Sequence, residues 1–207
     1  VLDSLKILHT GTFKDIKNRE KNNLLVLSKD GIKVGLLNYT YGTNGLPFSD
    51  PVYVNLLDSI LIKKDVTIAK NKDLDKLVVF VHWGYEYRDF PNSYQKKYNR
   101  FFKDLGVDIV IGSHPHVIQP MEYSKKNNEE YLTVYSLGNF VSNQREERKD
   151  GGAMFRLTFQ KIDNSIRISR KEYIPVWVHK FAKNGKNNYQ ILPCAKSLYN
   201  EKYFSNK

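Results

Sequence analysis

The sequence predicts an α/β domain in which a strand–helix–strand unit is followed by mainly antiparallel strands. Residues 77–81 and 107–111 are two short apolar runs rich in β-branched side chains, and a helical pattern lies between them. Such runs suit buried strands, and a helical crossover makes the two strands parallel. From residue 151 onward, alternating apolar residues separated by polar turns indicate antiparallel strands.

Several segments before this unit also carry a local pattern. Leucines at three-residue spacing in residues 1–8 predict the end of a helix already under way, and residues 13–19 predict a short helix. Residues 24–27 and 32–40 are strand-like and are joined through an Asp-Gly pair, which is a strong hairpin signal. Residues 54–69 have the apolar spacing typical of helices.

The helix between the two apolar runs is expected to begin at Ser93, which can cap it, and to stop at Gly106. Its apolar face comprises Tyr94, Tyr98, Phe101, Phe102 and Leu105. Beyond the unit, residues 117–123 and 130–135 predict two strands around a polar turn. The second of them leads to Asn139, which is therefore expected at a strand end.

Three of the five histidines follow the two core strands. His82 ends the first apolar run, and His114 and His116 follow the second. Because parallel strands end at the same edge of a sheet, we expect the three imidazoles to lie together, with Pro115 stiffening the turn between two of them. Such a cluster suits Zn²⁺, Mn²⁺ or iron. The alternative is a set of ordinary hydrogen-bonded loop histidines, and spacing alone leaves it open.

Composition bounds the class of protein. The 207 residues suffice for one buried domain, residues 1–207, and the single Cys194 excludes an intrachain disulfide and a thiolate metal site. The net charge of +11 would favour an anionic partner, but the lysines are scattered and no run of like charges marks a patch, which favours an ordinary solvated surface. No nucleic-acid motif is recognised, so no nucleic-acid partner is expected. Without a membrane-length apolar run or a signal peptide, the chain itself is expected to be soluble.

Five segments together resemble the CapA-type capsule and poly-γ-glutamate biosynthesis family, a branch of the calcineurin-like metallophosphoesterases. They lie in the family's order and span nearly the whole chain: residues 38–45, 82–87, 106–117 and 135–141, and Trp177. The resemblance implies a metallophosphoesterase-like four-layer αββα sandwich, two sheets face to face with helices outside. The chain would form its second half.

The resemblance also implies roles for individual residues. His82, His114 and His116 match ligands of a divalent metal centre, with Mn, Zn or Fe as the expected ions. Around them, the residues expected to bind substrate are Tyr41, Asn44, Trp83, Glu86 and Asn139. The alternative for the loop that contains Tyr41 and Asn44 is a plain glycine turn. No catalytic residue is assigned.

Family members carry an upstream half with further carboxylate, amide and histidine ligands, and those segments do not occur in this sequence. We therefore expect the chain to be a C-terminal portion with weak or partial metal occupancy by itself. Glu86 and Asp89, in the loop after His82, are the best-placed carboxylates. The full-length protein is expected to be exported or anchored at the cell surface.

Two functions from different classes follow. The first is a metal-dependent hydrolase, acting on a phosphoester or an amide during capsule or poly-γ-glutamate production. The second is a non-catalytic scaffold that holds an anionic polymer beside other membrane-bound subunits. Its support is the positive charge together with Trp83, Tyr85 and Tyr87 near the expected site.

Overall fold

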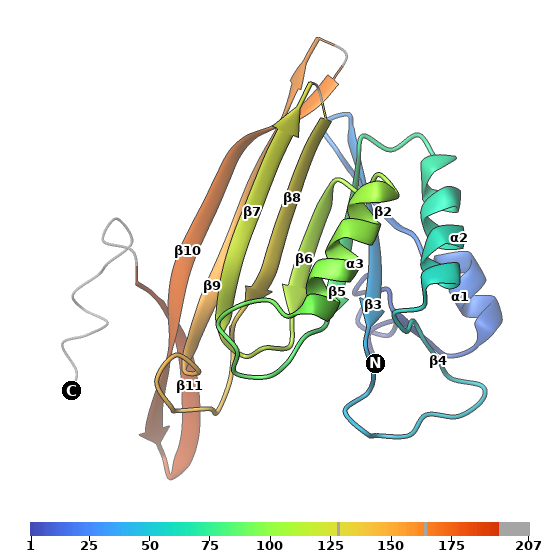
Figure 1. Cartoon of the computed structure of the whole chain (residues 1–207). Coiled ribbons are helices and arrows are strands. Elements are labelled where there is room, and N and C mark those ends of the chain that lie inside the picture. Colours follow the sequence, from blue (N-terminus) through green and yellow to red (C-terminus); the bar gives the residue numbers. More distant parts are fainter. Residues whose placement is uncertain (128, 164, 195–207) are drawn as a thin grey trace.

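The computed structural model describes residues 1–127, 129–163 and 165–194, so residues 195–207 of the predicted domain lie outside it. Its centre is a six-stranded sheet (Figure 1). In spatial order the strands are β2 (Leu25–Lys29), β3 (Ile32–Thr40), β5 (Lys76–His82), β6 (Ile109–Ser113), β8 (Glu129–Leu137) and β7 (Ile118–Lys126). The four inner strands are parallel, and the two edge strands run antiparallel to their neighbours. The predicted strand–helix–strand unit and the hairpin before it are confirmed.

Helices and a second sheet cover the two faces of the central sheet (Figure 1). One side carries α1 (Ile16–Asn22), α2 (Ser59–Lys70) and α3 (Ser93–Asp104). The other side carries an antiparallel sheet of β9 (Gly151–Ile162), β10 (Ser165–Lys183) and β11 (Lys186–Pro193), as the alternating pattern predicts. A short ribbon pairs β1 (Thr12–Phe13) with β4 (Tyr53–Val54). The described residues thus form three layers: helices, central sheet and second sheet.

Strand β5 has apolar neighbours on both faces, which explains its uninterrupted apolar run. Val79 and Val81 are completely buried in the cluster beneath the helices, together with Phe102 of α3. Val78 packs instead into the cluster between the two sheets, whose buried members include Ile168 of β10. The inner strands of the central sheet are therefore covered on both faces.

Some predicted element boundaries are wrong. Residues 1–8 form hydrogen-bonded turns rather than the end of a helix, and the first helix begins at Ile16. Helix α3 is capped by Asn92, not Ser93, because the Asn92 side-chain oxygen accepts a hydrogen bond from the backbone N–H of Gln95. In return, the Gln95 side-chain oxygen accepts from the backbone N–H of Asn92, which completes a capping box. Among the described residues, every helix is too short or too polar to cross a bilayer.

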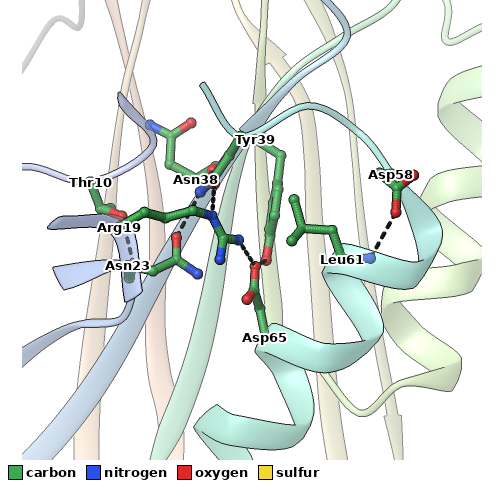
Figure 2. A network of polar contacts seen from close by, with 9 residues as sticks. Thr10, Arg19, Asn23, Asn38, Tyr39, Asp58, Leu61 and Asp65 are labelled. Atoms are coloured by element: carbon green, nitrogen blue, oxygen red, sulfur yellow. Dashed lines mark hydrogen bonds and ion pairs between the residues drawn. The ribbon is translucent and has the colours of Figure 1, made fainter. Parts of the chain in front are cut away.

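A buried polar network fastens α1 and α2 to the sheet (Figure 2). Arg19 of α1 donates to the Asp65 carboxylate of α2 at 2.5 Å and to the Asn55 side chain at 2.7 Å. The Tyr39 hydroxyl of β3 donates to the same carboxylate at 2.8 Å. Burial, together with the charge of Asp65, raises the pKa of the Tyr39 phenol far above its usual value. The network thus joins α1, α2 and β3, the strand that leads to Tyr41.

Trp83 is part of the core, so the prediction that it binds substrate is wrong. Its side chain is completely buried, and its indole N–H donates to the Tyr135 carbonyl at 3.0 Å. Gly112 lies against both groups, and any side chain at that position would overlap the Tyr135 carbonyl oxygen. The close approach of β6 to this tryptophan therefore requires glycine.

Candidate metal centre

The carboxyl ends of the parallel strands meet at one edge, where the candidate site lies. In the register of the central sheet, Thr40 of β3 pairs with His82 of β5, and His82 pairs with Ser113 of β6. The residues that follow β6 and β8 include His114, His116 and Asn139. The strand order thus brings side chains from four chain segments to one place.

The structure brings the three predicted histidines together. The ring centroids of His82 and His114 are 4.4 Å apart, and those of His114 and His116 are 6.0 Å apart. Tyr41 lies against two of these rings, with centroid distances of 5.4 Å to His82 and 4.8 Å to His114. Three imidazole rings and one phenol ring therefore lie together at this edge of the sheet.

The turn that carries His114 and His116 has an unusual backbone. Both residues adopt a positive φ, 100° for His114 and 59° for His116. Residues other than glycine rarely occupy this backbone region. A bond from the Tyr87 N–H to the Pro115 carbonyl, 2.7 Å long, holds the turn between them. Such strain costs on the order of 1–3 kcal/mol per residue and persists mainly where function requires the geometry.

Each histidine has a different environment. The Nδ1 atom of His82 lies 3.0 Å from the Thr40 hydroxyl, and the Nδ1 atom of His116 lies 2.8 Å from the Asn139 amide oxygen. The Nδ1 atom of His114 is buried, and within the described part of the chain it has no hydrogen-bond partner. A buried polar atom without a protein partner is commonly satisfied by a water molecule or an ion.

Burial keeps the imidazoles of His82 and His114 neutral near pH 7 by lowering the pKa of each. Burial, reinforced by the neighbouring His114 and His116, lowers the pKa of His82 to about 4. Burial also lowers the pKa of His114, although the Glu86 carboxylate opposes the effect. Neutral imidazole is the form that binds metal ions, so the environment favours ligation over protonation.

Glu86, predicted to bind substrate, lies among the candidate ligands. Its Oε1 atom is 3.8 Å from Nε2 of His116, and one ligand atom each of Glu86, His114 and His116 lie within 4.8 Å of one another. Ligands of one Zn²⁺ ion, each at roughly 2.0–2.2 Å, require only a small approach from these separations. His82 does not belong to this group, although its ring contacts His114. With the unpartnered Nδ1 of His114, the donor set fits a divalent ion.

Comparison with known proteins identifies the family. A model of the family described as "Bacterial capsule synthesis protein PGA_cap" matches residues 1–144. The chain belongs to this family. All the predicted site residues lie within the matched part.

Two curated relatives of the capsule synthesis family are similar over part of their length. The capsule biosynthesis protein CapA of Bacillus anthracis is 32% identical over 164 residues, which are 75% of this chain and 36% of the relative. The PGA biosynthesis protein CapA of Bacillus subtilis (strain 168) is 36% identical over 109 residues, 53% of this chain and 27% of the relative. The matched regions span about a third of these relatives.

A solved structure supports the fold. A putative 5′-nucleotidase from Staphylococcus aureus superimposes with a TM-score of 0.52 and 12% identity, covering 82% of this chain and 32% of that one. This family member thus has the metallophosphoesterase-type α/β architecture that the sequence predicts. At this identity the likeness concerns the fold alone.

A cavity of about 640 Å³ opens beside the histidines of this family member. Its walls are Tyr41, Asn44, Gly84, Tyr85, Glu86, Asn92, Tyr94 and His114. Tyr41, Asn44 and Glu86 therefore lie where substrate-binding residues were predicted, and their roles stay predictions. Tyr94, predicted on the apolar face of α3, lies in the first turn of that helix; its ring is 4.9 Å from that of Tyr98, and it also lines the cavity. The first turn of this helix lies next to the loops at the strand ends, and that position could have indicated that Tyr94 lines the site.

Asn139 and Trp83 do not line this cavity. Asn139 is buried, and its amide contacts His116, Gln144 and the Lys149 backbone. The indole of Trp83 points into the core, one residue after His82. Of the five predicted substrate-binding residues, the structure thus places three at the cavity and two elsewhere.

Proposed function

We propose that this chain provides part of the active site of a metal-dependent hydrolase in bacterial capsule production, with poly-γ-glutamate as the associated polymer. The observation that carries the proposal is the convergence of Glu86, His114 and His116 beside an aromatic cavity. The relatives' roles in capsule and PGA biosynthesis support the process. The whole protein would act beside other membrane-bound subunits at the cell surface.

Each residue of the edge has a distinct part in this proposal. Glu86, His114 and His116 would hold a divalent ion, Mn, Zn or Fe, with His82 adjacent. A bound ion supplies polarisation of a phosphoryl or acyl oxygen and a lowered pKa of water. Tyr41 and Asn44 would orient the substrate, a phosphoester or an amide. Glu86 is the one carboxylate in the ligand group, so we expect occupancy by this chain alone to be partial.

Replacing Glu86 with glutamine is expected to lower Mn²⁺ or Zn²⁺ affinity at least roughly tenfold, since an amide oxygen is a neutral and weaker ligand than a carboxylate. Elemental analysis and competitive titration of the purified chain measure the change. Hydrolysis of p-nitrophenyl phosphate and of a γ-glutamyl anilide, with and without chelator, tests the activity. Glu20→Gln, the same change at an exposed position of α1, serves as the control. Equal metal affinity in both variants would contradict the proposed ligand group.

A second candidate function is a non-catalytic scaffold that binds an anionic polymer, and the net charge of +11 favours it. Lys149, whose ammonium lies 3.8 Å from the Tyr87 ring centroid, places one cation near the site. In contrast, none of the described residues that line the cavity is a lysine or an arginine. If the scaffold function is right, poly-γ-glutamate binding should weaken steeply between about 50 and 500 mM salt and ignore chelator. Salt-insensitive binding in a filter or titration assay would remove this candidate.

A further inference from the structure

Asn139 connects the candidate metal centre to the loop that follows β8. Its amide oxygen lies 2.8 Å from Nδ1 of His116. Its amide nitrogen donates to the Lys149 backbone carbonyl and to the Gln144 side-chain oxygen, both at 2.8 Å. The side chain is buried and makes three hydrogen bonds, so it is placed to orient a neighbour rather than to meet a substrate.

The orientation of this amide follows from the hydrogen bonds themselves. A backbone carbonyl can only accept, so the NH₂ group of Asn139 must face Lys149. The amide oxygen then faces His116, and because it too can only accept, Nδ1 of His116 must carry the proton. One backbone carbonyl thus determines the tautomer of a histidine two hydrogen bonds away.

We propose that Asn139 is a positioning residue that holds His116 as the Nδ1–H tautomer, with the Nε2 lone pair directed toward Glu86. In this tautomer Nε2 has no proton to donate to the Glu86 oxygen 3.8 Å away. Two electron-rich atoms then face each other, an arrangement that a cation between them stabilises. The tautomer assignment stands on the hydrogen bonds alone, whereas its consequence for the metal rests on the proposed function.

Through Gln144, Asn139 also connects the loop after β8 to the loop after His82. With its oxygen committed to Asn139, Gln144 donates through Nε2 to the Tyr87 hydroxyl at 3.0 Å. The Tyr87 ring lies 5.9 Å from the His116 ring, and the Lys149 ammonium lies 3.8 Å from the centroid of the Tyr87 ring. His116 is thereby held by a hydrogen bond and an adjacent ring, both dependent on this loop.

The test is the protonation pattern of the His116 ring, observed by long-range ¹H–¹⁵N NMR of the metal-free chain. At about pH 8 an ordinary imidazole, with a pKa of about 6.5, is neutral. The wild-type chain should show the proton on Nδ1. Asn139→Leu should shift His116 toward the Nε2–H form that dominates in free histidine. Asn139→Asp, whose carboxylate still accepts from Nδ1–H, should restore the Nδ1–H form.

Gln144→Leu is the matched control, because it removes a partner of Asn139 without touching the bond to His116. It should leave the tautomer unchanged. Affinity for Zn²⁺ should fall roughly 10–100-fold in Asn139→Leu and much less in Asn139→Asp. If Asn139→Leu fails to fold, the wild-type spectrum still decides which nitrogen of His116 carries the proton.

A wild-type spectrum with the proton on Nε2, or an unchanged tautomer in folded Asn139→Leu, would overturn the inference. If Asn139→Asp retains the tautomer but loses as much Zn²⁺ affinity as Asn139→Leu, the proposed link between the His116 tautomer and metal binding would be overturned. The expected tautomer in a chain that binds no metal would refute the proposed function and leave the Asn139 assignment standing. The two failures are therefore distinguishable.

Discussion

Replacing His114 with alanine should leave the chain folded but unable to retain a divalent ion. His114 is the buried centre of the edge, since its ring contacts those of His82, His116 and Tyr41. Its Nδ1 atom lacks a partner among the described residues, so truncation removes no internal hydrogen bond at that atom. We expect Zn²⁺ or Mn²⁺ affinity to fall by at least roughly 100-fold, more than the 10–100-fold typical of an outer-shell change.

Isothermal titration of the metal-free chain measures this loss, and turnover by the longer family member measures its functional consequence. His179→Ala is the matched control, because His179 packs between Trp177 and Phe181 of β10, outside the ligand group. It should bind metal as the unaltered chain does. Normal binding by the His114 variant would show that the clustered histidines are a feature of the fold without a metal role.

Replacing Asp65 with leucine should lower the free energy of unfolding by about 3–5 kcal/mol, the usual result of removing one partner from a buried ion pair. The side chains of Asp65 and Arg19 are almost wholly buried, with 2% and 6% of their surface exposed. Truncation would leave the Arg19 guanidinium with the hydrogen bond to the Asn55 side chain and the Tyr53 ring 5.3 Å away, and no opposite charge. It would also remove the acceptor of the Tyr39 hydroxyl (Figure 2).

Urea unfolding followed by tryptophan fluorescence measures the change, and a double-mutant cycle separates the pair from its surroundings. Arg19→Met alone should cost a similar amount, and the double variant should lose much less than the sum. Asp73→Leu, which breaks the exposed pair with Lys33, should change stability by less than about 1 kcal/mol. Additive losses in the cycle would show that the pair is not coupled.

The sequence predicted the parts of the fold that depend on local pattern. The apolar runs around residues 77–81 and 107–111 correspond to β5 and β6, and the amphipathic segment between them is α3. Gly106 ends the helix region with a φ of 76°, as predicted. The errors are also local: the leucine spacing of residues 1–8 lacks a packing surface that would stabilise a helix there, and those leucines are exposed.

Side-chain direction after a strand could not be predicted. Trp83 and Glu86 follow His82 in one loop, yet the first turns into the core and the second faces the histidines. The difference arises because Gly112 of β6 leaves room for an indole beside β5. Contacts of this kind depend on residues about thirty positions apart, and no local period records them.

By itself, the sequence determined that His82, His114 and His116 meet, because parallel strands joined by a helix must end at one edge of their sheet. It likewise determined the enclosed central sheet, since continuous apolar runs must be covered on both faces. Only the tertiary structure decided that Glu86 joins the ligand group, that Asn139 orients His116, and that Arg19 pairs with Asp65. These contacts join side chains across loops and layers, where the direction of each residue is set by packing and hydrogen bonding rather than by its neighbours in the chain.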